Sequence, residues 1–216
     1  MKFAVMLLET LVVISPLCAF RLPTTGNGAL ANELQDFFDL LPLEKIIAVT
    51  KAYHVQDKQF QAMLSLVQSN EGKLFVQDVE ADPACKKLLN YMQDNGLDIY
   101  YLLNKLNESL DIPHIQPRSV TEITGGIIGY LEDVAALIPL GEFTKVYEDK
   151  RKHSKVFNDY AKTFLSEENI KFYLSLHKNV HFKNVEKSAG EIGIEQAAFR
   201  QSYLFFVVIS GVVGKM

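Results

Sequence analysis

Apolar residues recur along this chain at the spacing that places side chains on one face of an α-helix. The i, i+3, i+4, i+7 order of such a face appears several times. The clearest stripes are Leu34, Phe37, Phe38 and Leu41; then Phe60, Met63, Leu64 and Val67; then Ile99, Leu102, Leu103, Leu106 and Leu110. No comparable stretch alternates apolar and polar residues with a period of two, which would indicate a strand. The pattern predicts an all-α protein of amphipathic helices.

The first two stripes return 97 residues later in the chain. The phrase DLLPLEKI at residues 39–46 corresponds to ALIPLGEF at residues 136–143. An ungapped alignment of residues 34–107 with residues 131–204 gives 13 identities in 74 positions. Unrelated sequences of ordinary composition would give about four or five. The chain is therefore predicted to contain two related helical halves, each with about five or six helices.

Prolines and glycines indicate where the helices begin and end. Pro42 and Pro139 are each followed at once by a helical pattern, which suits a proline in the first turn of a new helix. Gly96 and Gly193 each separate two helical patterns, where a left-handed C-terminal cap is expected. The dipeptide DP at residues 82–83 predicts a further helix start.

These features divide the chain into five segments. They are residues 1–19, a signal peptide; residues 20–28, a flexible leader; residues 29–110, the first helical half; residues 111–125, a linker; and residues 126–216, the second helical half. A chain of 216 residues would suit one domain or two small ones, and its 48% hydrophobic content is ample for a sizeable core. We expect both halves to form one domain.

The N-terminus has the order of a secretory signal. Lys2 precedes the apolar stretch FAVMLLETLVVI and then SPLCAF, so cleavage most simply follows Ala19. Cleavage would remove Cys18 and leave Cys85 without an internal disulfide partner. Asn107 begins the sequon NES and is a candidate glycosylation site. We predict a secreted, extracellular protein that depends on its hydrophobic core or is further stabilised by whatever fills it.

Few residues suggest catalysis or metal binding. His177 and His181 are four positions apart, but Lys178 stands where a zinc protease motif carries glutamate, so both are interpreted as surface histidines. The basic run at residues 150–153 is interpreted as a solvated helix face. The apolar run at residues 203–214 is interpreted as a buried final helix, since a membrane span takes about 20 residues. We predict a non-catalytic protein without a metal or cofactor, and its net charge of −4 does not favour nucleic acid.

Three stretches of the chain resemble the insect allergen-related repeat family. They are LQDFFDLLPLEKIIAVTKAYHVQDKQFQAMLSLVQSNEG, NGLDIYYLLNKLNESL and GGIIGYLEDVAALIPLGEFTKVYEDKRKHSKVF, and the resemblance covers roughly residues 30–203. Members include the cockroach midgut allergen, midgut microvillar proteins of blood-feeding flies and nitrile-specifier proteins of butterflies. The resemblance implies an all-helical capsule of two halves around a large apolar cavity that holds fatty acids or phospholipids.

The function that this resemblance implies is that of a secreted midgut lipid-binding protein, in the gut lumen or at the microvillar surface. Its partners would be lipids, with membrane surfaces or microvilli as further candidates. The candidate cavity residues are Phe37, Phe60, Met63, Leu64, Val67, Phe75, Leu103, Val134, Phe157, Tyr160, Phe164, Phe172 and Phe199. One alternative is a defence protein that disrupts membranes by lipid exchange. Another is a nitrile-specifier-type detoxification factor.

Overall fold

The computed structural model describes residues 20–109 and 123–194, and within these ranges the fold is all-α, as predicted. The first half contains α2 (Ala29–Asp39), α3 (Leu43–Gln56), α4 (Lys58–Gln68), α5 (Asn70–Ala81), α6 (Pro83–Asp94) and α7 (Ile99–Ser109). The second half contains α8 (Gly126–Ala135), α9 (Leu140–His153), α10 (Lys155–Phe164), α11 (Glu167–Ser175), the 3₁₀ turn η1 (Leu176–Lys178) and α12 (Val180–Glu191). The predicted signal peptide, most of the linker, Phe199 and residues 203–214 lie outside the described residues.

The helix boundaries follow the 97-residue interval of the sequence repeat. Helices α3 and α9 both begin and end 97 residues apart, and so do α6 and α12. The counterpart of α5 is divided into α11 and η1, which together span the equivalent residues. Local sequence signals that recur at this interval therefore recur as local structure.

Short polar side chains begin most of these helices. The Asp57 carboxylate accepts a hydrogen bond from the Phe60 backbone N–H at 2.7 Å, and the Ser154 hydroxyl accepts one from the Phe157 N–H at 3.0 Å. These bonds satisfy backbone donors that have no partner inside the helix. Pro42 and Pro139 are N-cap residues of α3 and α9, one position earlier than the first turn that their pattern suggested.

Two glycines end helices in the left-handed conformation, as their positions predicted. Gly96 has a φ of 102° and Gly193 a φ of 78°. At Gly96 a Cβ atom would also lie 2.6 Å from the Ala29 backbone nitrogen. A side chain at this position would therefore clash with the start of α2 as well as strain the backbone.

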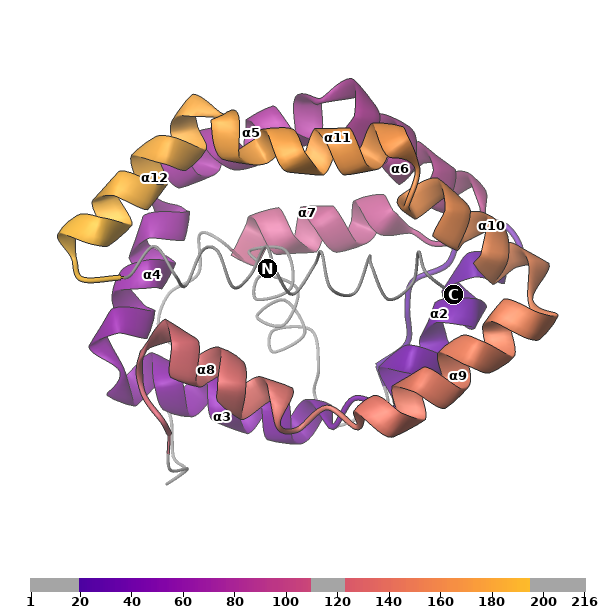
Figure 1. Cartoon of the computed structure of the whole chain (residues 1–216), viewed down its shortest axis with the longest axis horizontal. Helices are drawn as coiled ribbons and strands as arrows, with labels where there is room; N and C mark the ends of the chain where they lie inside the picture. Colours follow the sequence, from indigo (N-terminus) through magenta and orange to yellow (C-terminus); the bar gives the residue numbers. More distant parts are fainter. Residues whose placement is uncertain (1–19, 110–122, 195–216) are drawn as a thin grey trace.

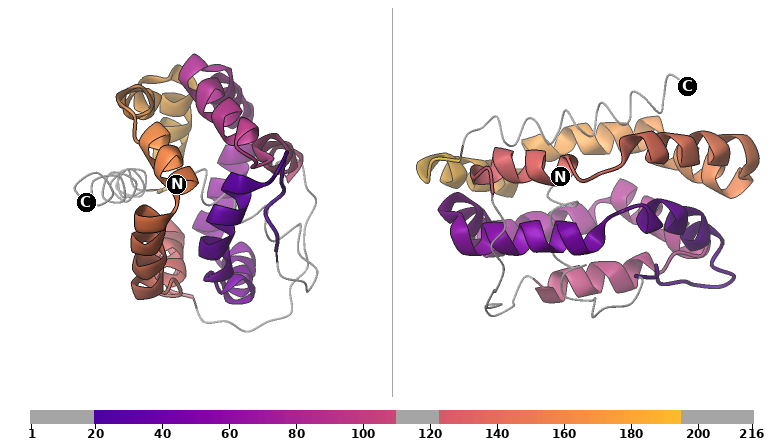
Figure 2. Two further views of the ribbon diagram at one scale, coloured as in Figure 1. Left: turned by 90° about the vertical axis from the view of Figure 1, so that its right-hand side faces the viewer. Right: turned by 90° about the horizontal axis from the view of Figure 1, so that it is seen from below.

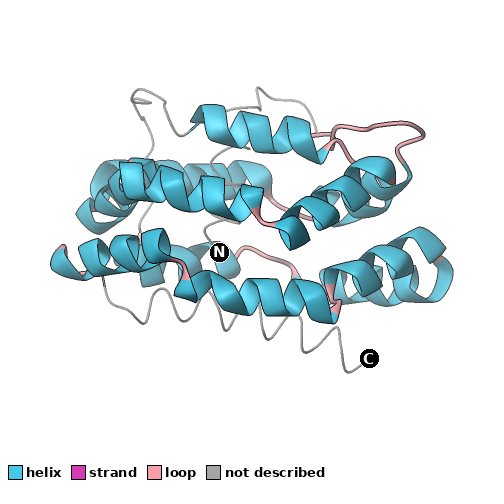
Figure 3. Ribbon diagram, turned by 90° about the horizontal axis from the view of Figure 1, so that it is seen from above, coloured by secondary structure: helices cyan, strands magenta, loops and turns pink. Residues whose placement is uncertain are grey.

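Helices of the first half pack against helices of the second half. Helix α2 packs against α9 and α10 of the second half, while its counterpart α8 packs against α3 and α4 of the first. Two more contacts of this kind join the halves, one between α5 and α12 and one between α6 and α11 (Figure 1). Seen from below, the first-half helices lie in one layer and the second-half helices in the next, with α7 on the far side of the first layer (Figure 2). Figure 3 shows the same layers as rows of helices.

Residues 20–28 are packed, so the prediction of a flexible leader was wrong. The Leu22 side chain is 6% exposed, and its backbone N–H donates to the Gln35 side chain at 2.8 Å. The Pro23 carbonyl accepts from the Asp98 N–H at 2.9 Å, and Thr24 forms an isolated antiparallel bridge with Leu97. The glycines and threonines of the segment suggested mobility, whereas one apolar side chain and these backbone bonds hold it against α2 and the start of α7.

Two clusters of buried side chains stabilise the fold. The first, formed mainly by α2, α6 and α7, contains Leu22, Leu30, Ala31, Cys85, Leu89, Met92, Leu97, Ile99, Leu102 and Leu103. The second, which joins α3, α4 and α8 to α12 and the residues just after it, contains Ile46, Tyr53, Phe60, Ile127, Tyr130, Val134, Ala189 and Ile194. None of the described helices is long and apolar enough to cross a membrane.

Candidate functional site

The candidate lipid-binding residues are distributed over both clusters. Phe60, Val134 and Leu103 are themselves buried cluster members. Six others pack against the clusters and are only partly buried. We call these six the apolar surface; Met63 and Leu64 pack against the second cluster, and Val67, Tyr160, Phe164 and Phe172 pack against the first. Phe199 lies outside the described residues.

The remaining candidates make aromatic contacts between helices. The ring of Phe37 on α2 stacks on that of Phe157 on α10, with centroids 5.5 Å apart. The ring of Phe75 on α5 lies 5.3 Å from that of Phe182 on α12. Because these rings belong to different halves, part of the expected lipid surface is occupied by contact between the halves.

A series of neighbouring rings runs along α10 and leads to the apolar surface. From Phe157 the series continues to Tyr160 and then Phe164, with centroid distances of 6.5 and 5.8 Å. Phe143 and Tyr147 of α9 extend it at the other end through Phe37 and Phe157. The sequence interpretation missed these two α9 residues, although residues 143, 146, 147 and 150 have helical-face spacing, because Lys150 interrupts the apolar character of that face.

Local sequence explains why α10 presents this series. Ser154 caps the helix, so positions 157, 160, 161 and 164 follow in the i, i+3, i+4, i+7 order on one face. The polar residues Lys155, Asp159 and Lys162 fall on the other side of the helix. One face of α10 is therefore apolar, with three aromatic residues and Ala161, while the other remains in contact with water.

The Tyr160 hydroxyl indicates how apolar this region is. Burial raises its pKa to about 12, and the nearby Tyr91 adds to the shift. The side chain nevertheless keeps part of its area uncovered by protein atoms. The hydroxyl is therefore buried, while the residue as a whole keeps some uncovered area, and removing apolar area from water by contact with a further apolar group is favourable.

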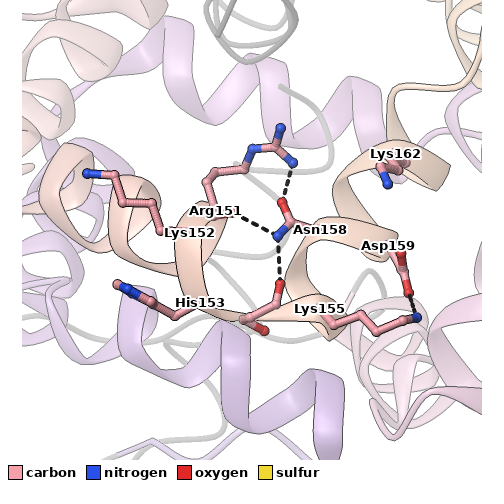
Figure 4. A pocket seen from close by; sticks show the side chains of 8 residues that line it. Arg151, Lys152, His153, Lys155, Asn158, Asp159 and Lys162 are labelled. Carbon is pink, nitrogen blue, oxygen red and sulfur yellow. Dashed lines mark hydrogen bonds and ion pairs between the residues drawn. The ribbon is translucent and has the colours of Figure 1, made fainter.

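The described residues also form a hollow of about 490 Å³ at the turn between α9 and α10 (Figure 4). It is lined by Arg151, Lys152, His153, Ser154, Lys155, Asn158, Asp159 and Lys162. These side chains are polar or charged, so this hollow is not the apolar cavity that the family resemblance implies. We call it the α9–α10 hollow.

The prediction that residues 150–153 form a solvated helix face was wrong for its first member. The Lys150 residue is 7% exposed, and its ammonium donates to Glu33 at 2.8 Å and to Asp36 at 2.5 Å. Those hydrogen bonds raise the pKa of Lys150 against the opposing effect of its burial. The other members, Arg151–His153, line the α9–α10 hollow.

The two histidines singled out by their spacing lie on separate elements. His177 belongs to η1 and His181 to α12, with the N-cap Asn179 between them. The His181 Nδ1 atom lies 2.8 Å from the Glu71 carboxylate of α5, and this contact lowers the pKa of Glu71. His181 therefore joins α12 to α5 rather than forming a pair with His177.

Asn107, the candidate glycosylation site, lies in α7. Its side-chain amide donates to the Glu80 carboxylate at 3.1 Å and is partly buried. A glycan on this nitrogen would replace that hydrogen bond, so modification remains a prediction that requires the end of α7 to adjust.

These observations define an all-α protein of paired helical units with aromatic faces, and its sequence matches known proteins of that kind. A family model described as insect allergen related repeat, nitrile-specifier detoxification matches residues 29–199. The chain is also 32% identical over 163 residues to Protein G12 of Anopheles gambiae. The aligned region covers 73% of this chain and 75% of that protein. The chain therefore belongs to the insect allergen-related repeat family.

Proposed function

We propose that this protein is a secreted, non-catalytic insect midgut protein that binds fatty acids or phospholipids against the apolar surface. The observation that carries the proposal is the set of six apolar side chains that pack on buried clusters and yet keep uncovered area. Membership of the family supports it further.

The energetics favour long alkyl chains over short ones. Burying a methylene group contributes about 0.8 kcal/mol, so ten methylenes contribute about 8 kcal/mol. Association costs roughly 4–15 kcal/mol in lost freedom of motion. A short acid would not offset that cost, whereas a chain of fatty-acid length would do so if most of it were covered.

The proposal can be tested on purified protein in two ways. Organic-solvent extracts should contain lipid by mass spectrometry, and delipidated protein should take up a fluorescent fatty acid. Phe164→Gln should weaken uptake because Phe164 belongs to the apolar surface. Leu140→Gln is the matched control, since Leu140 is 67% exposed and outside that surface. Absence of lipid from the extract together with absence of uptake would show the proposal to be wrong.

Secretion is tested separately from lipid binding. The full chain, expressed in insect cells, should appear in the medium with its N-terminus at Phe20. Retention in the cells with an intact Met1 would contradict secretion and leave the binding proposal unaffected.

Nitrile-specifier detoxification is a second candidate because the description of the matching family includes it. A factor of this kind would redirect glucosinolate breakdown toward nitriles. Myrosinase and a glucosinolate, incubated with and without the protein, would test it. An unchanged proportion of nitrile among the products would exclude this activity.

A further inference from the structure

The α9–α10 hollow concentrates positive charge in a protein whose net charge is −4. Four of its lining side chains, Arg151, Lys152, Lys155 and Lys162, are cations at neutral pH, and one, Asp159, is an anion. Among the described residues no hydrogen-bond or ion-pair partner occupies the ammonium of Lys152 or of Lys162. The local sign of charge is thus opposite to that of the whole chain.

Hydrogen bonds hold the turn that forms this hollow. The Asn158 amide donates to the carbonyls of Arg151 and Ser154 at 2.8 and 2.9 Å. Its oxygen accepts from the Arg151 guanidinium, so the amide lies between that guanidinium and the turn (Figure 4). Lys155 bonds to Asp159, and the positive charges of Lys155 and Lys162 help to lower the pKa of that carboxyl. Arg151 is thereby oriented, with N–H groups left for another acceptor.

The equivalent turn in the first half shows that the fold does not require these cations. Asp57 and Ser154 are equivalent caps with nearly the same backbone, φ −107° and ψ 112° against φ −104° and ψ 111°. Gln61, the counterpart of Asn158, closes the first turn in the same way, by donating to the His54 carbonyl at 2.7 Å. In the first half, however, the positions equivalent to Arg151, Lys152 and Lys162 carry His54, Val55 and Ser65.

We propose that the α9–α10 hollow binds a phosphate group carried by an organic ligand. A planar guanidinium matches two phosphate oxygens at once, and lysine ammonium groups add charge at close range. The volume of about 490 Å³ leaves room for the organic part of a phosphate ester beside the anion. The site is exposed, so its affinity falls as salt increases. This inference does not depend on the lipid-binding proposal, because the hollow and the apolar surface share no residue.

The test is a calorimetric titration of the mature protein with glycerol phosphate at low salt. Arg151→His combined with Lys162→Ser introduces the first-half residues, which the same turn accommodates. This variant should bind about tenfold more weakly, by analogy with the loss of a charge-assisted hydrogen bond. The control combines Lys86→His with Lys183→Ser, which removes two exposed charges elsewhere, and it should bind like the wild type.

Three further readouts make the result decisive. Equal melting temperatures for the variants exclude unfolding as the cause, and unchanged fatty-acid uptake separates this site from the apolar surface. Vesicles of phosphatidic acid, tested against phosphatidylcholine, distinguish the ligand sources: binding only of glycerol phosphate indicates a soluble ester, and variant-sensitive binding of both indicates a lipid headgroup. Failure of the wild type to bind glycerol phosphate at millimolar concentration, or equal binding by all three proteins, overturns the proposal.

Discussion

The two halves meet at two equivalent joints that use different chemistry. At the first joint the Tyr53 hydroxyl of α3 donates to Asp133 of α8 at 2.5 Å. At the second, the Lys150 ammonium of α9 donates to Asp36 of α2 at 2.5 Å and to Glu33 at 2.8 Å. Tyr53 and Lys150 are 97 residues apart, and so are Asp36 and Asp133. At both joints a donor on α3 or its counterpart α9 meets a carboxylate of the other half, and this donor is neutral at the first joint and charged at the second.

The surroundings of the two joints also differ. Tyr53 is fully buried, its oxygen accepts from the Gly125 N–H at 3.0 Å, and the neighbouring hydroxyls of Thr50 and Tyr130 lie 3.0 Å apart. The counterpart of Thr50 at the second joint is Tyr147, whose hydroxyl is buried without a hydrogen-bond partner among the described residues. The first joint is therefore a satisfied polar network, whereas the second relies on the two ion pairs of Lys150, beside an unsatisfied tyrosine hydroxyl.

The largest expected effect is the loss of the Tyr53 ring. Tyr53→Ala should lower the free energy of unfolding by about 3–5 kcal/mol, because it leaves a cavity in the second cluster and removes the donor to Asp133. The measurement is urea unfolding of the purified protein. As a control, Tyr101→Ala, at a position that is 44% exposed, should change the free energy of unfolding by less than about 0.5 kcal/mol. If both variants lost a similar amount of stability, the buried packing and hydrogen bond assigned to Tyr53 would be contradicted.

A smaller loss is expected at the second joint. Lys150→Ala should cost about 1–3 kcal/mol, less than for a fully buried pair, because the Asp36 side chain is 59% exposed and water can solvate it. Lys150→Tyr introduces the residue of the first joint and should retain more stability than the alanine variant. The same urea experiment measures both, and a tyrosine variant less stable than the alanine variant would show that the joints are not interchangeable.

Acid should weaken the first joint. Partial burial opposes ionisation of Asp133, but hydrogen bonds from Thr124 and from Tyr53 outweigh it and lower its pKa below 3.8. A carboxyl with a depressed pKa stabilises the fold above its unfolded pKa, and this stability is lost as pH falls through the folded value. The stability difference between wild type and Tyr53→Phe should therefore be larger at pH 6 than at pH 3. If the stability difference were the same at both pH values, the lowered pKa of Asp133 and its link to Tyr53 would be contradicted.

The smallest effect is expected for the unpartnered hydroxyl. Tyr147→Phe should leave stability within about 0.5 kcal/mol of the wild type or raise it slightly, because no hydrogen bond among the described residues is lost. Tyr130→Phe, which removes the bond to Thr50, should cost about 1 kcal/mol. Thermal and urea unfolding of the two variants would measure the contrast, and a larger loss for Tyr147→Phe would show that its hydroxyl has a partner.

The candidate site was predictable in part. Phe60, Leu103 and Phe164 were selected by helical spacing, and each is a member of a buried cluster or packs against one. Spacing could not distinguish a side chain that lies against another helix, such as Phe37 on Phe157, from one with uncovered area. That difference depends on which helix of the other half is the neighbour.

Residues a few positions apart specify the class of fold and the helix ends at Gly96 and Gly193, so these features could be predicted from local patterns. The 97-residue interval follows from comparing the chain with itself. The packing of α2 on the second half and of α8 on the first is seen only in the folded structure. Tyr53 and Asp133 are separated by 80 residues, and Lys150 and Asp36 by 114. Local patterns do not specify such partners, so neither the burial of Lys150 nor the packing of residues 20–28 could be predicted from them.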